Sequence, residues 1–456
     1  MLSVVLELRH LAYNFKFPPP APPINVGVEN PPTFMGGAGG GGDNMIKDKK
    51  ILLCLCGGIA VYKCVELASL LVKSGAIVKT IMTKSAMEFV SPLTFQSITK
   101  ETVSYKMFDT RANIEHISLS DWADIIVIVP ATANIIGKIA SGIADDLLTT
   151  TVMAAKCPIL IVPAMNVNMY ENPIVQENIE KLERYDYKIL EPETGWLACG
   201  VVDKGRMPCV EEILFAIKTY LYYKLDLKGK SILITAGASI ERIDQMRHIT
   251  NVSSGKMGIA LARAAYFRGA DVSLVHASVY EKIPYFLKCI KALSASEMYD
   301  VSMKLFPDTD CVIMCAAVAD FTIKNPLLGK LKKAETLTLN LDKSVDILEE
   351  MGKKKDKQFL IGFAAESENL IENAQKKLEK KNLDIIVANN LSVAGKDEAE
   401  IVILKKSQSG NADILSASFG TTSDADKMSA FPKEKFYLAH KIIDEYLICQ
   451  NNLKHT

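Results

Sequence analysis

The chain has 456 residues, of which 49% are hydrophobic and 23% are charged, enough for two domains with their own cores. Lysine plus arginine and aspartate plus glutamate both number 53, so no net charge favours a nucleic acid or an anionic membrane. No apolar run reaches the length of a membrane span. The ten cysteines form no C-x-x-C pair, which predicts reduced thiols in a cytoplasmic protein. Six scattered histidines predict no zinc site.

Residues 1–44 have a composition that does not favour a folded core. A mildly apolar start is followed by P-P-P-A-P-P and then by G-G-A-G-G-G-G. Such a segment cannot bury enough surface to order itself, and no signal-peptide core with a cleavage site is evident. We therefore expect a disordered leader, with the folded part beginning near Met45.

The remainder reads as two α/β domains that divide near residue 225. Apolar strands are predicted first at 51–56, 76–82, 124–130 and 158–163, and then at 231–237, 271–276, 310–317, 359–363 and 384–389. Helical stretches separate them, one at about 368–381, and an amphipathic helix covers 436–447, whereas 405–430 is expected to be a loop. Continuous apolar strands alternating with helices predict doubly wound, mostly parallel sheets, with functional groups at the carboxyl ends of the strands.

Three segments of the first half carry candidate functional groups. In T-G-W-L-A-C-G-V-V-D-K-G-R-M-P (194–208), Cys199 is either a buried structural thiol or an acid, base or nucleophile near the cation Arg206. C-L-C-G-G-I-A (54–60) is a phosphate-binding helix start or a plain tight turn, and it lacks the features of a standard NAD site. Asn134 and Asn166, in P-A-T-A-N and P-A-M-N-V-N-M-Y, form a shared pocket or merely cap helices. His116 is structural or a base.

The second half offers groups that suit phosphates and magnesium. T-N-V-S-S-G-K-M-G (250–258) fails the Walker A pattern at Thr250 and Met257, yet a glycine turn that opens a helix with a lysine still suits phosphate. Asp320 follows the strand in C-A-A-V-A-D-F and suits magnesium or ligand hydroxyls. G-K-L-K-K (329–333) is a phosphate contact or a solvated basic turn.

Taken together, residues 45–450 resemble the family of bifunctional coenzyme A biosynthesis flavoproteins, in which a phosphopantothenoylcysteine decarboxylase is fused to a phosphopantothenate–cysteine ligase. The first half carries G-G-I-A-V-Y-K, P-A-T-A-N-I-I-G-K-I-A-S-G-I-A-D-D-L-L-T-T, P-A-M-N-V-N-M-Y and L-A-C-G…G-R-M. The second carries I-T-A-G, R-H-I-T-N-V-S-S-G-K-M-G, A-A-V-A-D-F, K-L-K-K and G-F-A-A-E. The resemblance implies two Rossmann-like domains, a flavodoxin-like FMN-binding domain at 45–225 and a ligase domain at 226–456.

For the first half, the resemblance implies FMN-dependent decarboxylation of 4′-phosphopantothenoylcysteine to 4′-phosphopantetheine. His116 would lie near flavin and substrate, Asn166 would bind the departing carboxylate, and Cys199 would protonate the decarboxylated product. Substrate would contact Met165 and Arg206. The implied flavin-binding residues are Gly57, Gly58, Ile59, Ala60, Thr83, Ser85, Pro130, Ala131, Thr132 and Asn134.

For the second half, the resemblance implies that CTP and magnesium activate 4′-phosphopantothenate as an acyl-cytidylate, which cysteine then attacks. Asn251 would hold this intermediate, with Arg247 close by, and Asp320 would hold the metal. Lys377 and Lys381, one helical turn apart, would share a face. The implied nucleotide-binding residues are Met314, Cys315, Ala316, Asp320, Lys330, Val345, Asp346, Ile347, Leu348, Phe363, Lys377 and Lys381.

The chain departs from the family pattern in places. K-N-P-D is replaced by K-S-V-D at 343–346, T-A-G-P-T by T-A-G-A-S at 235–239, and Pro208, Cys209 and Val210 follow G-R-M. A preference for CTP over ATP rests on the resemblance alone. Alternative readings are a flavoprotein that acts on peptide cysteines or prenylates flavin, and a regulatory subunit without activity. By resemblance, we expect a cytoplasmic homo-oligomer, a dodecamer built from trimers of the first domain and dimers of the second.

Overall fold

The computed structural model describes residues 44–107, 115–196, 200, 202–326, 329–330, 338–390, 401–406, 412–415 and 435–454. The predicted leader up to residue 43 lies outside these ranges, and so does Cys199. The first described element is the short 3-10 helix η2 (Asn44–Ile46).

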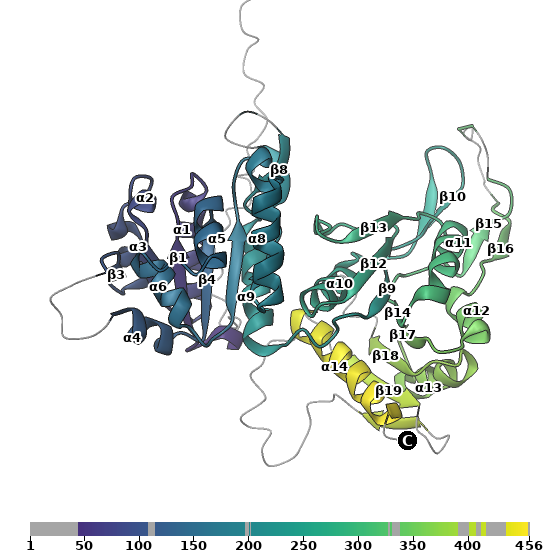
Figure 1. Ribbon diagram of the computed structural model, residues 1–456. Coiled ribbons are helices and arrows are strands. Elements are labelled where there is room, and N and C mark those ends of the chain that lie inside the picture. Colours follow the sequence, from purple (N-terminus) through teal and green to yellow (C-terminus); the bar gives the residue numbers. More distant parts are fainter. Residues whose placement is uncertain are drawn as a thin grey trace, which may run out of the picture. The chain divides into compact units, whose positions relative to one another are not determined.

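The first half contains a parallel sheet of six strands in the order β3-β2-β1-β4-β5-β6. This is the order of a Rossmann-type doubly wound sheet, in which the direction of winding changes between β1 and β4 (Figure 1). The strands are β1 (Lys50–Leu55), β2 (Ile77–Met82), β3 (Val103–Ser104), β4 (Ile125–Ala131), β5 (Ile159–Pro163) and β6 (Lys188–Ile189).

Helices cover both faces of this sheet because its central strands are apolar on both sides. In β1, Ile51, Leu53 and Leu55 enter one core, whereas Leu52 and Cys54 enter the other. The first core is closed by α1 (Val61–Lys73), α2 (Lys84–Met87), α3 (Pro92–Thr99) and α9 (Val210–Tyr222). The second is closed by α4 (Glu115–Trp122), α5 (Ala133–Ala140), α6 (Leu147–Ala154), α7 (Val167–Tyr170) and α8 (Pro173–Arg184).

The second half repeats the winding and adds an antiparallel edge. Its eight strands run in the order β13-β12-β9-β14-β17-β18-β19-β20, and only the pairs β18–β19 and β19–β20 are antiparallel. The strands are β9 (Ser231–Ala236), β12 (Asp271–His276), β13 (Lys288–Lys291), β14 (Cys311–Met314), β17 (Phe359–Glu366), β18 (Ile385–Asn390), β19 (Ile401–Lys406) and β20 (Ala412–Leu415). The predicted α/β fold class with mostly parallel sheets is confirmed.

Two sequence predictions for this sheet were wrong in their bounds. The loop expected from residue 405 instead begins with the end of β19 and contains β20, because the apolar run at 401–404 pairs with β18 and serves as the template for β20. The strand expected at 310–317 ends at Met314, where the chain turns into the carboxyl edge of the sheet. The predicted loop beyond residue 415 lies outside the described residues.

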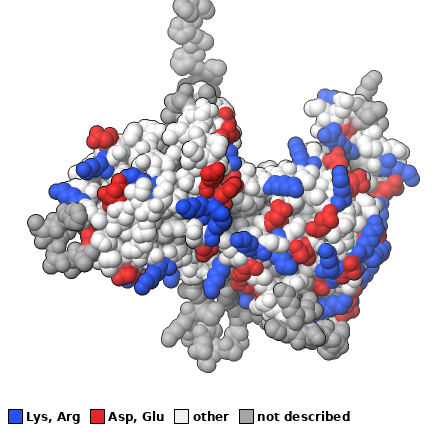
Figure 2. Space-filling view, in the orientation of Figure 1, with Lys and Arg blue, Asp and Glu red and all other residues white. Residues whose placement is uncertain are grey.

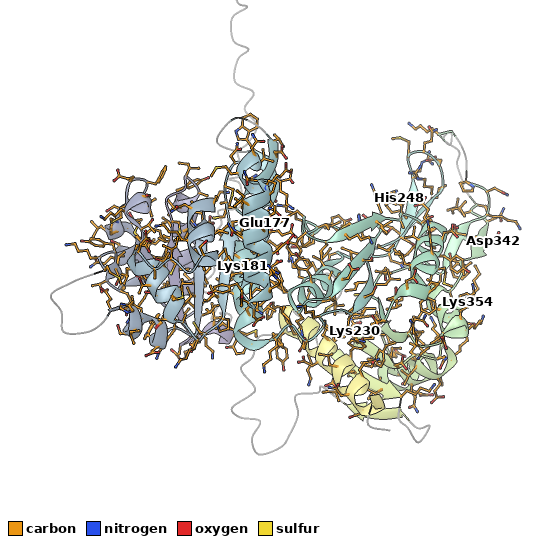
Figure 3. The ribbon with its side chains drawn as sticks, viewed as in Figure 1. Glu177, Lys181, Lys230, His248, Asp342 and Lys354 are labelled. Carbon is orange, nitrogen blue, oxygen red and sulfur yellow. The ribbon has the colours of Figure 1, made fainter. Side chains whose placement is uncertain are left out.

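Helices also cover both faces of the second sheet. One core contains α10 (Lys256–Phe267) and α14 (Lys435–Lys454), and the other contains α11 (Ala295–Leu305), α12 (Ile347–Lys354) and α13 (Leu370–Lys380). A 3-10 turn, η3 (Phe306–Asp308), follows α11. Two hairpins, β10 (Ile240–Arg242) with β11 (His248–Thr250) and β15 (Phe321–Ile323) with β16 (Leu341–Lys343), project from the carboxyl edge. Figure 3 labels His248 and Asp342 in these hairpins and Lys230 at the opposite edge.

The surface carries both signs of charge. On the face shown in Figure 2, lysine and arginine side chains are interspersed with aspartate and glutamate, as the balanced composition predicts. Across the residues that the structure describes, no helix is both long enough and apolar enough to cross a membrane. Every cysteine in those residues is a free thiol.

A buried cluster around Arg268 ties the end of α10 to α14 and to the segment between the two sheets. The guanidinium makes ion pairs of 2.7 Å with Asp226 and with Asp444, and its carbon lies 4.8 Å from the centre of the Tyr223 ring. The His440 ring stacks on the Tyr223 ring, with 4.0 Å between the two ring centres. Arg268 and His440 are almost completely buried, so this polar cluster is part of the core.

We expect His440 to make the protein less stable as the pH falls. Burial, and next the nearby positive charge of Arg268, lower the pKa of His440 to about 3, so the folded state keeps it neutral while the unfolded chain takes up a proton below about pH 6.5. Between these values the free energy of unfolding should fall by up to about 1.4 kcal/mol per pH unit. Urea unfolding of the wild type and His440→Gln across this range measures the effect, and identical pH slopes would contradict it.

Candidate functional site

The first half holds a cavity of about 1620 Å³ at the carboxyl ends of its central strands. Turns that follow four strands form its wall: residues 56–60 after β1, 83–85 after β2, 132–134 after β4 and 164–166 after β5. A hairpin of β7 (Glu193–Trp196) and β8 (Val202–Arg206) completes it. Because β1 and β4 are the neighbours at which the winding reverses, the cavity lies where doubly wound sheets usually bind ligands.

The turn after β1 is shaped to receive an anionic group. A Cβ atom on Gly57 would lie 2.2 Å from the Cβ of Ser85, so only glycine permits this approach of the two turns. Within the described part of the chain, the backbone N–H groups of Ile59 and Ala60 donate no hydrogen bond. They precede α1, a helix of 13 residues, and free N–H groups at a helix start bind phosphates and carboxylates well.

Several cations line this cavity, among them Arg206 and Lys63. Arg206 was predicted from the sequence, but Lys63 was missed. Burial and the nearby charge of Arg206 lower the pKa of Lys63, which places the two side chains in one electrostatic environment. The G-G-I-A-V-Y-K motif contained the signal, since Lys63 comes one turn after the glycine turn at the start of α1. Two neighbouring cations favour an anionic ligand.

The hairpin is fastened to the turn after β5. The Met165 N–H donates to the carbonyl of Gly205 at 3.0 Å, and a Cβ atom on Gly205 would lie only 2.2 Å from the Met165 carbonyl oxygen. Asn166 caps α7 by accepting a hydrogen bond of 2.9 Å from the Asn168 N–H. The structure thus brings the predicted residues Met165, Asn166 and Arg206 onto one wall.

The other predicted residues of the first half fall into three groups. Thr83 and Thr132 line the cavity while their hydroxyls cap α2 and α5, and exposed Asn134 also lines it. Pro130 and Ala131 are the last two residues of the buried strand β4 and are not among the residues that line the cavity. His116, on half-buried α4, is not among the lining residues, and Cys199 lies outside the described residues. Lining residues that the sequence reading missed include Tyr105, Lys106, Lys138 and Asp145.

In the second half, the turns after β9, β11 and β14 are joined at the carboxyl edge. The Asn251 side-chain amide donates to the carbonyls of Ala317 at 3.3 Å and Val318 at 3.2 Å. The Ala316 N–H donates to the Thr235 hydroxyl at 3.1 Å. These bonds place the predicted stretch from Met314 to Ala316, with Cys315 half-buried, beside Asn251.

Glycines let the start of α10 press against the end of β9. A Cβ atom on Gly258 would lie 2.6 Å from that of Ala236, and one on Gly237 would lie 2.2 Å from the Ser278 carbonyl oxygen. Gly255, which precedes the helix, has φ +77, a conformation that favours glycine. The glycines of the S-S-G-K-M-G segment are therefore required for this close packing, independently of any ligand.

Several predicted nucleotide contacts make ion pairs within the protein. Lys377 of α13 pairs with Glu366 at 2.6 Å, and Lys381, which caps the end of this helix, pairs with Asp346 at 2.7 Å, so the two lysines have separate partners. Burial raises the pKa of Asp346, but the hydrogen bonds from Lys381 and from the Glu349 N–H outweigh it and hold the pKa below its usual value. Asp346 also caps α12.

The remaining predicted residues of the second half differ in exposure. Ile347 and Leu348 are buried in α12, and Phe363 is half-buried in β17, whereas Asp320, Lys330 and Val345 are exposed. Arg247 pairs with the buried carboxylate of Asp244 at 3.3 Å. Over the described ranges, no three His, Cys, Asp or Glu side chains gather as a metal site.

Comparisons with known proteins match both halves. The flavoprotein family model matches residues 42–221, and the model of the DNA/pantothenate metabolism flavoprotein C-terminal domain matches residues 227–417. The chain is 47% identical to the Coenzyme A biosynthesis bifunctional protein CoaBC of Bacillus subtilis (strain 168), covering 77% of this chain and 88% of that protein. The corresponding protein of Escherichia coli (strain K12) is 39% identical over 75% of this chain and 86% of its own length.

Solved structures are similar to parts of the chain. A crystal structure of the C-terminal domain of Coenzyme A biosynthesis bifunctional protein CoaBC is 33% identical, covers 50% of this chain and 98% of that chain, and has a TM-score of 0.39. The FMN-dependent cysteine decarboxylase SpaF is 32% identical, covers 39% of this chain and 97% of its own, and has a TM-score of 0.34.

Proposed function

The chain belongs to the family of Coenzyme A biosynthesis bifunctional proteins (CoaBC), and from this membership we propose the chemistry of its two halves. The protein is a bifunctional enzyme of coenzyme A biosynthesis with a decarboxylase and a ligase activity. We assign the decarboxylase to residues 45–225 and the ligase to 226–456. The ligase half joins 4′-phosphopantothenate to cysteine, and the other half decarboxylates the product to 4′-phosphopantetheine.

The observation that carries the decarboxylase assignment is the cavity with its anion-binding turn. The close approach of Gly57 to Ser85, with the free N–H groups of Ile59 and Ala60, fits the phosphate of FMN. Gly58, Thr83, Pro130, Ala131, Thr132 and Asn134 would surround the rest of the cofactor. When bound, FMN supplies a reversible two-electron oxidation of the substrate thiol.

The protein's own groups would orient the substrate and move protons. Asn166 would hold the departing carboxylate, Met165 would contact the substrate, and Arg206 would neutralise an anionic group of the substrate. Cys199 would donate the proton that restores the saturated product. His116 is proposed to act near flavin and substrate, although it does not line the cavity of one chain.

In the ligase half, the substrate carboxylate would attack the α-phosphate of CTP and release pyrophosphate. The cysteine amine would then displace CMP from the acyl-cytidylate, which Asn251 and Arg247 would hold. Asp320 would share Mg²⁺ with the nucleotide phosphates, because Mg²⁺ commonly uses one or two carboxylates plus phosphate oxygens. The nucleotide would contact the stretches 314–316 and 345–348 and the side chains of Lys330, Phe363, Lys377 and Lys381.

We also propose a cytoplasmic homo-oligomer, a dodecamer of trimers and dimers, without a nucleic-acid or membrane partner. Large apolar side chains that are exposed on both halves support association: Tyr62 is 59% exposed, Leu93 66%, Val252 87% and Tyr280 85%. The free thiols support a reducing compartment.

Product analysis tests the function. Purified protein is mixed with 4′-phosphopantothenate, cysteine and magnesium, with either CTP or ATP, and the products are identified by mass. We expect 4′-phosphopantetheine and CMP in the CTP mixture, and little product with ATP. Accumulation of 4′-phosphopantothenoylcysteine would contradict the decarboxylase assignment, and the absence of any product would contradict both.

A further inference from the structure

The hairpin that carries Arg206 into the cavity is contacted at its base by residues 280–287 of the second half. Lys282 Nζ lies 2.6 Å from Glu193 Oε1 in β7. The Tyr285 hydroxyl donates to the carbonyl of Glu191, two residues before β7. Phe286 packs against the core of the first half, which fixes this segment in place. The base of the hairpin is therefore built from both halves of the chain.

These contacts are close to Arg206. Glu193 lies opposite Arg206 in the strand register of β7 and β8. The Arg206 side chain passes over Gly195, where a Cβ atom would lie 2.8 Å from the Arg206 Cδ. The charge of Glu193 also acts on Lys63, another cation of the cavity, because it partly offsets the lowering of the Lys63 pKa by burial and by Arg206. Glu193 is thus placed to influence both cations.

Glu193 needs a cation because its side chain is only 11% exposed. A carboxylate this buried is costly unless it is paired. Lys282 supplies the partner from outside the cavity, and the hydrogen bond to Glu193 raises the pKa of Lys282, so this lysine keeps its charge at neutral pH. Without Lys282, the carboxylate would turn to Arg206, its neighbour across the hairpin, and occupy the guanidinium that faces the ligand.

We propose that Lys282 and Tyr285 are positioning residues of the decarboxylase site: they hold the hairpin, and Lys282 engages Glu193 so that Arg206 stays available to an anionic substrate. The inference rests on the proposed function. It makes the ligase half a structural component of the other half's site. The alternative is a purely structural role, in which the two contacts only hold the halves together. Their loss would then weaken both activities alike.

The main variant is Lys282→Met, which removes the charge but keeps the length of the side chain. We expect KM for 4′-phosphopantothenoylcysteine to rise about fivefold, with kcat and the ligation rate unchanged, because a partly exposed ion pair contributes about this factor. Lys282→Arg should restore KM. The matched control is Lys288→Met, which removes an exposed lysine of β13 six positions away along the same chain. It should behave as the wild type.

A second readout does not depend on activity. The rate at which phenylglyoxal modifies Arg206, followed by peptide mass analysis, reports whether its guanidinium is free. We expect about fivefold slower modification in Lys282→Met than in Lys288→Met, because Glu193 then covers Arg206. Equal rates would overturn the proposal, as would equal losses of decarboxylation and ligation in Lys282→Met. If the wild type fails to decarboxylate, the proposed function fails, while the modification rates still decide this inference.

Discussion

Replacement of Arg268 by alanine should lower the free energy of unfolding by about 3 kcal/mol. Its guanidinium is 2% exposed and bridges Asp226 and Asp444, so the substitution leaves two carboxylates without their shared cation. Their side chains are 36% exposed and can regain some water, which places the loss at the lower end for a broken buried pair. The Tyr223 ring also loses the cation that lies over it.

Urea unfolding followed by circular dichroism measures this loss. The matched control is Arg184→Ala, which removes an exposed arginine at the end of α8 and should change the free energy of unfolding by less than about 0.5 kcal/mol. Arg268→Lys should be intermediate, since one ammonium cannot serve both carboxylates with the geometry of a guanidinium. If Arg268→Ala unfolds at the same urea concentration as Arg184→Ala, the cluster does not stabilise the fold as described.

Replacement of Gly205 by alanine should lower kcat/KM for decarboxylation about a hundredfold while ligation continues, because small displacements of positioning groups cost about this much. Gly205 has φ +129, which strains any residue with a Cβ atom. That atom would also lie 2.2 Å from the Met165 carbonyl oxygen. The hairpin must therefore move away from the turn after β5, and Arg206 moves with it.

The control variant Gly229→Ala separates the effect of backbone strain from the effect of displacing the hairpin. Gly229 has φ +78, but a Cβ atom there meets nothing within 4 Å. This control should show a modest loss of stability with normal decarboxylation kinetics. Decarboxylation by Gly205→Ala at the rate of Gly229→Ala would show that the contact between β8 and Met165 does not position the site.

Much of the fold could be predicted because both sheets are covered on both faces. Such strands are continuously apolar, so segments such as 51–56 and 158–163 stand out in the sequence. Short polar strands carry no such signal. The hairpin of β7 and β8 was expected only as a glycine-rich segment, since E-T-G-W and V-D-K-G-R show no alternation of apolar residues.

Contacts between residues that are far apart in the chain could also not be predicted from the sequence. Lys63 lies in the G-G-I-A-V-Y-K motif, but it was missed because the motif does not show that this lysine is close to Arg206. The ion pairs of Lys377 with Glu366 and of Lys381 with Asp346 were likewise not predicted. In the sequence, a lysine that pairs with a carboxylate cannot be distinguished from one that binds a phosphate. Motifs at strand ends were more informative, because topology alone places turns after β1, β2, β4 and β5 around one cavity.

We expect the site in the first half to decarboxylate the product of the second half without any external oxidant or reductant. The direct test gives 4′-phosphopantothenoylcysteine to the purified protein in the absence of oxygen and of any added oxidant or reductant, and measures CO₂ and 4′-phosphopantetheine. We expect equal amounts of both over many turnovers, because oxidation and reduction cancel within one site. No CO₂, or CO₂ without 4′-phosphopantetheine, would contradict it.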